Sequence, residues 1–486
     1  MSVATRIARN SFMIISAQTF GQAMAFFYFM YIARHLGAEG FGVISFAIAL
    51  VAIFAIFMDF GLPLLTAREV ARDNGLASKH LANLSAMRIF LCSVTFAFIV
   101  LTMEWFGYKA DTGKAVYLVA LSAVIGSFCN MLYSVFQAYE RLEYQSAGLL
   151  LNGALTLSGV FIATVFDFGV IGFASLFLFA SVASLLYGVL ALRAVFPEVF
   201  SAWRAKLFKF DAAFWKTALK DAYPFGLIAF FCTATLFADS ILIERMKGDA
   251  AVGLYNAPVR IVSPIFLVAS AVVAAVYPAM AKGGNFFRLF EKSFEYLTII
   301  GVPIGIVITL LAERLIEAVF GVAYAGSAGP LKAFAWVLVF VFMSIPFSNL
   351  FACLNRQSVL AVICAVSLVF NVLLNIAVIP GYGITGASVV SAATQFMIFA
   401  FCYAWSVRAG YYVRVGKFIG LLLKVSASGA VMGVFITGFG ALPMPVLVPI
   451  AALIYGAALF VVKGIRVEDM EVARNALFAK GRDVNA

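Results

Sequence analysis

Apolar segments long enough to cross a membrane follow one another along almost the whole chain. The 486 residues are 64% hydrophobic and only 12% charged, whereas a soluble domain carries roughly 25% charged residues. A spanning helix needs about 20 apolar residues. Candidate segments lie near residues 11–33, 41–64, 84–104, 115–138, 147–167, 170–192, 222–243, 256–280, 295–312, 331–353, 358–379, 384–407, 418–437 and 445–462. The sequence therefore predicts a polytopic membrane protein with about fourteen transmembrane helices.

The apolar runs are continuous, which predicts an all-α fold. Lipid-exposed backbone must satisfy its own hydrogen bonds, so only helices and closed barrels span membranes. Barrel strands alternate apolar and polar residues over about ten positions, and these segments do not.

The basic residues predict the orientation. If the N-terminus is cytoplasmic, 24 of the 34 Lys and Arg residues fall on the inside and six on the outside, as the positive-inside rule requires. Both termini are therefore expected in the cytoplasm. The same asymmetry accounts for the net charge of +11 without a nucleic-acid partner.

Two pairs of loops repeat. RHLGAEGFGVIS (34–45) matches RMKGDAAVGLYN (245–256) at an offset of 211, and FGVIGFAS (168–175) matches YGITGAS (382–388) at an offset of 214. Short reversals often recruit glycine, which would explain isolated glycines but not the shared spacing. Because the offset covers six helices, both halves enter the membrane in the same sense. They are predicted to be parallel repeats related by an axis along the membrane normal.

This repeat divides the chain into four parts. Residues 1–193 form an N-terminal lobe of six helices, and residues 222–408 form a C-terminal lobe of six. Between them, residues 194–221 mix aromatic residues with lysines and are predicted to be an amphipathic linker at the cytoplasmic headgroups. Residues 409–486 add two helices and a cytoplasmic tail.

Four short motifs carry a family resemblance. They are Leu36-Gly37-x-x-Gly40-Phe41-Gly42, Asp59-Phe60-Gly61-Leu62, Asp239 in the seventh helix, and Val252-Gly253-Leu254-Tyr255-x-Ala257-x-x-Arg260-Ile261. The chain resembles polysaccharide exporters, the Wzx-type lipid-linked oligosaccharide flippases of the multidrug/oligosaccharidyl-lipid/polysaccharide superfamily.

The resemblance implies a two-lobed, V-shaped transporter in the bacterial inner membrane. Such a protein moves undecaprenyl-diphosphate-linked sugars from the inner to the outer leaflet by alternating access, for O-antigen, capsule or exopolysaccharide synthesis. Its expected partners are that polyprenyl-linked glycan, membrane lipids, and the polysaccharide polymerase with its chain-length machinery.

A diphosphate inside the bilayer needs fixed cations, because buried charges are costly unless paired. The planar guanidinium of arginine bonds phosphate oxygens in pairs. Arg260 is the first candidate, since related peptidoglycan-precursor flippases carry an arginine in a similar Tyr-x-Ala-x-x-Arg motif. Arg88, Arg34 and Arg245 follow. Each also has a simpler interpretation, a cation reaching the interface from near a helix end.

Two acidic residues are candidates for ion coupling. Asp239 lies inside the seventh helix, where a carboxylate is a functional-site hypothesis by default. It can bind a coupling ion, either a proton or sodium, or form a salt bridge between the lobes. Asp59, at the inner end of the second helix, can do either and is the better candidate for a gate contact. No cofactor and no structural or catalytic metal site are expected.

Other functions fit the sequence less well. No GxxxxGK[ST] phosphate-binding loop occurs, so ATP hydrolysis is not expected. An ion-coupled multidrug antiporter of the same superfamily is the main alternative, but it would not need the last two helices. A membrane enzyme is not expected, because the longest outer loop, near 314–330, is short and largely apolar.

Overall fold

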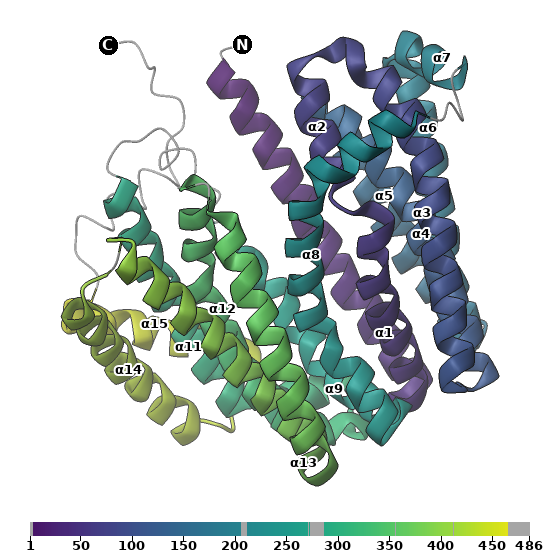
Figure 1. Ribbon diagram of the computed structural model, residues 1–486. Coiled ribbons are helices and arrows are strands. Elements are labelled where there is room, and N and C mark those ends of the chain that lie inside the picture. Colours follow the sequence, from purple (N-terminus) through teal and green to yellow (C-terminus); the bar gives the residue numbers. More distant parts are fainter. Residues whose placement is uncertain are drawn as a thin grey trace.

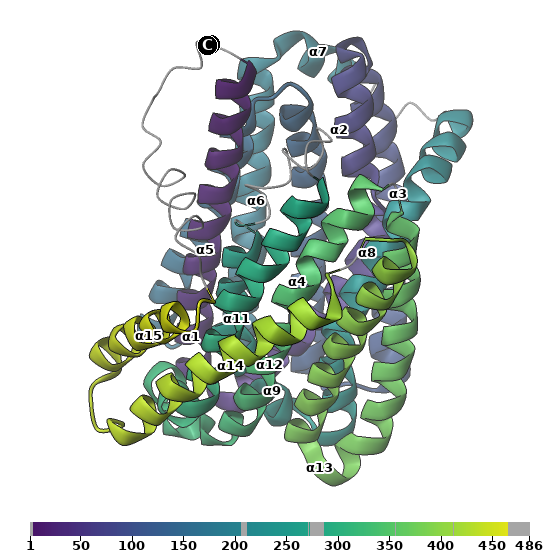
Figure 2. The ribbon, with the colours of Figure 1, turned by 90° about the vertical axis from the view of Figure 1, so that its left-hand side faces the viewer.

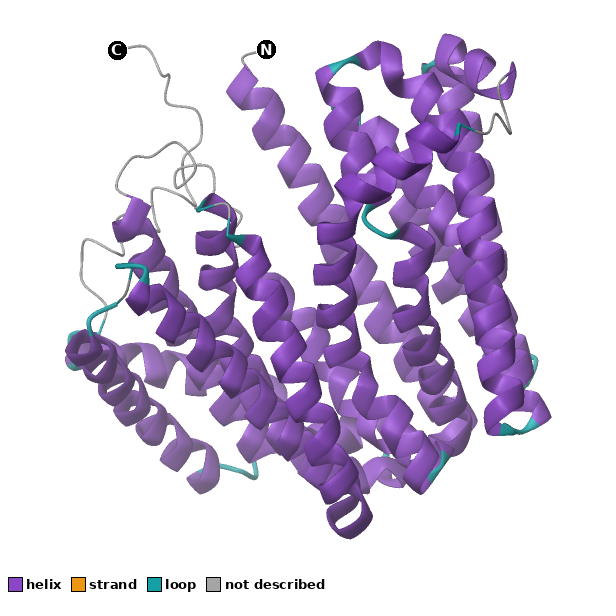
Figure 3. Cartoon of the chain, in the orientation of Figure 1, coloured by secondary structure: helices purple, strands orange, loops and turns teal. Residues whose placement is uncertain are grey.

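The protein is helical throughout the region described by the computed structural model, which covers residues 3–205, 211–270, 272, 286–354, 356–411 and 413–464 (Figure 3). Twelve helical stretches in this region are long and apolar enough to span a membrane. Two of them, Met13–Arg72 and Gln357–Arg408, exceed 50 residues and break at Gly37 and Gly383. Counting each side of these breaks separately gives fourteen spans, which confirms the predicted all-α polytopic fold.

The helices form two lobes that diverge from a shared apex, which gives the V shape that the family resemblance implies (Figure 1). The N-terminal lobe contains α1 (Val3–Asp59), α2 (Leu62–Arg72), α3 (Ala77–Phe106), α4 (Ala110–Ala138), α5 (Leu142–Val165), α6 (Val170–Val195) and α7 (Pro197–Ala205). The C-terminal lobe contains α8 (Ala212–Lys247), α9 (Asp249–Val262), α11 (Phe286–Phe320), α12 (Ala328–Cys353) and α13 (Gln357–Arg408).

The two helices without a repeat counterpart lie on the outside of the C-terminal lobe. They are α14 (Val415–Gly438) and α15 (Met444–Val461). Both contact α11 and each other, and α14 runs obliquely past α11 and α12 (Figure 2). The predicted tail beyond residue 464 lies outside the described residues.

The breaks after the first and seventh spans have the same backbone conformation. Gly37 has φ 68° and ψ −174°, and Gly248, at the repeat offset of 211, has φ 80° and ψ 179°. This region of backbone space is open essentially only to glycine. The matched spacing noted in the sequence thus reflects a matched chain reversal.

The lobes touch at the apex through two further repeat-related glycines. A Cβ on Gly42 would clash with the carbonyl of Asp249, and one on Gly253 would clash with the carbonyl of Ala38. Ala38 and Asp249 are themselves 211 residues apart, so the two contacts are equivalent under the repeat. Such a reciprocal contact between α1 and α9 is expected of parallel repeats that are related by an axis along the membrane normal.

The helix that contains the seventh span starts earlier than the hydropathy suggests. Helix α8 begins at Ala212, ten residues before the predicted start, and Asp211 caps it by accepting a hydrogen bond from the Phe214 amide at 3.0 Å. These first turns are amphipathic and pack on the N-terminal lobe, with the Trp215 ring 6.1 Å from that of Phe90. Residues 206–210 of the predicted linker lie outside the described residues.

Candidate functional site

Asp239 lies on α8, eight residues before the end of that helix, and is 2% exposed. Three neutral groups donate hydrogen bonds to its carboxylate. The Tyr255 hydroxyl and the Ser391 hydroxyl each lie 2.5 Å from Oδ2, and the Asn375 amide lies 2.7 Å from Oδ1. These partners come from α9 and from both halves of α13, so the site joins the central helices of one lobe.

Further oxygen atoms surround the same carboxylate. The Asn375 amide also lies 3.2 Å from Asn371 Oδ1, and the Asn371 amide lies 3.3 Å from the hydroxyl of Thr394. The side-chain amide oxygen of Asn375, Oδ1, is buried without a hydrogen-bond partner among the described residues. The group is therefore rich in hard oxygen atoms, which suit a proton or an alkali cation better than a soft metal.

No described cation pairs with Asp239. All of its described partners belong to the C-terminal lobe, so the interlobe salt bridge considered from the sequence does not form in this conformation. A buried carboxylate that lacks a cation carries a large desolvation cost. Binding a proton or a cation removes that cost.

Asp59 has a different environment in the N-terminal lobe. Its Oδ1 lies 2.5 Å from Nη1 of Arg88 and 2.6 Å from the Ser127 hydroxyl, and Asn130 donates to Oδ2 at 3.1 Å. Arg88 also donates to both the hydroxyl and the carbonyl of Ser127. Asp59 therefore forms an ion pair within one lobe and makes no ion pair between lobes in the described region.

Arg88 is fully buried, with a relative exposure of 0%. Its guanidinium is already neutralised by Asp59, while Nε and Nη2 are buried without partners. In this conformation Arg88 is closed off from any ligand, although the sequence suggested it as a diphosphate contact.

Arg260 lies where the two lobes meet. It projects from α9 of the C-terminal lobe, and its guanidinium carbon lies 3.5 Å from the centre of the Phe29 ring in α1 of the N-terminal lobe. The Nε atom is buried without a hydrogen-bond partner, and within the described residues no acid forms an ion pair with this arginine. Stacking holds the plane of the guanidinium while leaving its charge uncompensated.

Arg34 and Arg245 cross between the lobes at the apex. Arg34 donates to the carbonyls of Val319 and Ala318 at 2.8 and 2.6 Å, at the end of α11 in the opposite lobe. Its repeat partner Arg245 lies 5.7 Å from the Phe106 ring, at the end of α3. Both arginines therefore join the lobes in this conformation, and Arg34 complements the negative end of a helix.

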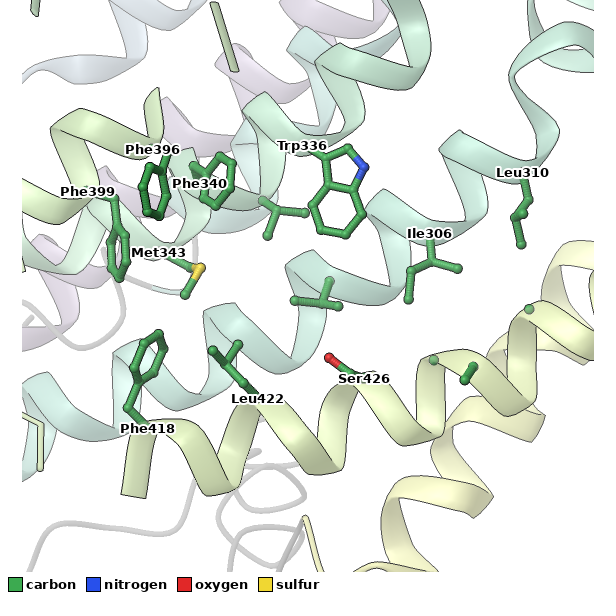
Figure 4. A pocket seen from close by; sticks show the side chains of 15 residues that line it. Ile306, Leu310, Trp336, Phe340, Met343, Phe396, Phe399, Phe418, Leu422 and Ser426 are labelled. Atoms are coloured by element: carbon green, nitrogen blue, oxygen red, sulfur yellow. The ribbon is translucent and has the colours of Figure 1, made fainter. Parts of the chain in front are cut away.

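An apolar groove separates α14 from the C-terminal lobe. It has a volume of about 570 Å³, and aromatic and aliphatic side chains from α11, α12, α13 and α14 point into it (Figure 4). Among its lining residues Ser426 carries the only hydroxyl. The groove lies between α14 and helices α11, α12 and α13, so the first of the two additional helices supplies one wall of a surface that suits hydrocarbon.

Sequence reasoning found Asp239 but did not find its partners. Asn371 and Asn375 are two of many polar residues within the predicted spans, Tyr255 stands in the motif that contains Arg260 without any sign of a link to Asp239, and nothing in the sequence singles out Ser391. One usable signal was present, because Asn371 and Asn375 are four residues apart and share a helix face.

Comparisons with known proteins agree with this architecture. The chain is 24% identical over 378 residues to a protein of Shigella flexneri named "Putative O-antigen transporter", covering 74% of this chain and 88% of that protein. The lipid II flippase MurJ in an inward closed conformation superposes with a TM-score of 0.75 at 14% identity, over 94% of this chain and 99% of that structure. An inward-facing multidrug resistance MATE family transporter of the MOP superfamily superposes with a TM-score of 0.64 at 15% identity, over 80% and 94%.

These likenesses confirm the fold and the family resemblance. Residues 7–283, more than half of the chain, match the family described as "Polysaccharide biosynthesis protein". The chain therefore belongs to this family of polysaccharide biosynthesis proteins.

Proposed function

We propose that this protein is a flippase for undecaprenyl-diphosphate-linked oligosaccharides. In this proposal it moves repeat units from the inner to the outer leaflet of the bacterial inner membrane, with both termini in the cytoplasm, and hands them to a polysaccharide polymerase and its chain-length machinery. The name of the Shigella flexneri relative supports an envelope polysaccharide as the product.

The uncompensated guanidinium of Arg260 is the observation that carries the proposal. It comes from one lobe, rests on Phe29 of the other, and lies between the two bodies that alternating access must separate. A diphosphate bonded to Arg260 would lie at the contact between the two lobes. The apolar groove beside α14 offers the prenyl tail a hydrocarbon-like path, so only the headgroup needs a polar route.

Asp239 supplies the coupling site in this proposal. Because its described partners are neutral hydrogen-bond donors, loading and unloading a proton or sodium ion changes the net charge of the lobe core. Such a change can bias two arrangements of the lobes only if the ion binds one arrangement more tightly. The coupling ion is therefore expected to bind at Asp239, while Arg260 binds the diphosphate of the substrate.

Reconstitution with a labelled short-chain prenyl-diphosphate sugar tests the proposal. The Arg260→Ala variant should lose roughly 50-fold or more in flipping rate, the upper range of a single coupling energy. Arg260→Lys should fall between wild type and Arg260→Ala, because it keeps the charge but loses the paired hydrogen bonds. The exposed Lys114→Gln variant is the matched control and should match wild type.

A deletion strain separates this proposal from the multidrug antiporter. Lipid-linked repeat units should accumulate on the inner leaflet of the deletion strain, and only a plasmid with intact Arg260 should clear them. Wild-type flipping by Arg260→Ala would refute the diphosphate role. Drug hypersensitivity together with normal surface glycan would favour the antiporter instead.

A further inference from the structure

A second pocket lies on the opposite side of α14 from the apolar groove, between α11, α14 and the end of α15. It has a volume of about 360 Å³. Its lining combines five cations and two acids: Arg288, Lys292, Lys417, Lys424, Lys463, Glu291 and Glu295. By the alternation of the spans, this pocket lies at the membrane face where α1 begins, the face that the basic residues assign to the cytoplasm.

The two acids of the pocket are already paired. Lys417 lies 3.0 Å from Glu291 and 2.6 Å from Glu295, and Lys292 lies 3.2 Å from Glu295. These contacts tie the start of α14 to the start of α11. They leave the remaining cations without carboxylate partners in the described region.

Those remaining cations are Arg288, Lys424 and Lys463. The Lys424 ammonium is held in place by the carbonyl of Lys463 at 2.9 Å, so its position is fixed while its charge is not neutralised. Between them the wall is open at Gly420, where an added Cβ would meet no atom within 4 Å. Among the residues that the structure describes, the pocket thus combines three cations that face no carboxylate with room for a ligand.

The setting of the pocket selects a lipid over a soluble anion. Phe460 and Val461, three and two residues before Lys463, are 53% and 77% exposed, which places apolar surface next to the charges. Basic pockets between transmembrane helices on the cytoplasmic side suit phosphate headgroups whose chains stay in the bilayer.

We infer that this pocket binds the phosphate headgroup of an anionic lipid. Arg288, Lys424 and Lys463 contact the phosphate oxygens, and the chains of the lipid lie along the exposed apolar surface of α15. The lipid can be a phospholipid of the leaflet or a prenyl phosphate, since both present the same group. The inference does not depend on the flippase assignment, because it rests on the charges and the open space of this pocket between α11, α14 and the end of α15.

Native mass spectrometry of the purified full-length protein tests this inference with four probes. They are phosphatidylglycerol, farnesyl phosphate, phosphatidylcholine and inorganic phosphate. Wild type should retain phosphatidylglycerol, farnesyl phosphate or both, and should retain neither phosphatidylcholine nor inorganic phosphate. Which anionic lipid is retained more strongly identifies the source of the headgroup.

Two variants test the site independently. Replacing Arg288, Lys424 and Lys463 together by Gln should lower retention at least tenfold, because each cation near an anionic lipid contributes roughly a fivefold factor. Gly420→Leu should lower retention similarly by filling the pocket while keeping every charge. The control replaces Lys79, Arg193 and Arg204 by Gln, removing three exposed cations at the same membrane face of the other lobe, and should retain lipid as wild type does.

The outcome is decisive even if the triple variant folds poorly, because Gly420→Leu keeps the ion pairs of the pocket. Unchanged retention of anionic lipid by Gly420→Leu would overturn the inference. Displacement of the lipid by inorganic phosphate alone would also overturn it. Loss of lipid with normal flipping would leave the proposed function intact, and lost flipping in Arg260→Ala with normal lipid retention would leave this site intact.

Discussion

The carboxylate of Asp59 in the N-terminal lobe faces a guanidinium, whereas that of Asp239 in the C-terminal lobe faces only neutral donors. At the apex the same two lobes are alike, because Gly42 and Gly253 make reciprocal contacts. The halves therefore share equivalent residues where they meet, and they differ in the surroundings of their intramembrane acids.

This difference indicates a division of labour. A carboxylate paired with arginine is neutral as a unit and holds α1, α3 and α4 together without needing an exchangeable ion. An unpaired carboxylate changes the charge of its surroundings whenever a proton or cation enters or leaves. The N-terminal acid is therefore expected to matter for stability, and the C-terminal acid for coupling.

The largest expected effect comes from Asp239→Asn. The variant keeps the shape of the side chain and removes the ion site, so flipping should fall by roughly 50-fold or more. The thermal midpoint should hold or rise, because no buried charge remains to be desolvated. Flipping rates in proteoliposomes and unfolding scans measure the two quantities, with proton and sodium gradients applied separately.

Asp59→Asn should show the opposite pattern in the same measurements. The variant leaves the Arg88 guanidinium buried without its counter-charge, so the protein should lose stability before it loses transport. The comparison fails if Asp59→Asn abolishes gradient dependence while Asp239→Asn retains it.

The next effect concerns the strength of the Asp59–Arg88 pair. Arg88→Met should destabilise the protein by about 2 kcal/mol, less than for a fully buried pair because Asp59 is 29% exposed. Combining it with Asp59→Asn should restore part of that loss, and the double-mutant cycle gives the coupling energy. The exposed pair of Lys114 and Asp111, 3.3 Å apart, is the control and should couple by less than about 0.5 kcal/mol. Equal coupling energies in the Asp59–Arg88 and Asp111–Lys114 pairs would contradict the structural role assigned to Asp59.

The smallest effect tests the similarity of the halves. Gly42→Ala and Gly253→Ala should each push the lobes apart at the apex, by about the same amount, because their contacts are equivalent. Spin labels at exposed Asp111 and Met246, in opposite lobes, should report a longer distance distribution in both variants. Gly126→Ala, where an added Cβ meets no atom within 4 Å, is the control. A shift in one variant only would show that the apex is not symmetric.

Much of the fold could be predicted because it depends on local sequence. Each span is marked by its own apolar run, since the bilayer imposes the same requirement on every helix. The paired glycines at 37 and 248 were visible as a repeat because a chain reversal with positive φ demands the same residue twice. The first turns of α8 fall in the segment predicted to be amphipathic, but their continuity with the seventh span was not predicted, because they gain their packing from another lobe.

The candidate residues show where local information ends. Arg88, Arg34, Arg245 and Arg260 look alike in sequence, as basic residues near the ends of apolar segments. The structure buries the first against Asp59, ties the second and third across the apex, and leaves the fourth without an acid. An arginine's role depends on whether a carboxylate faces it, and sequence spacing does not report that.

Hydropathy and repeat spacing are enough to establish that the chain spans the membrane many times, that it is helical, and that its two halves repeat a common pattern. Those properties follow from hydrophobicity and backbone geometry, which act over a few residues. The packing of the helices settles which acid faces an arginine and which faces only neutral donors in the described region. Electrostatic pairing joins side chains from helices far apart in sequence, so it exists only once the lobes have packed.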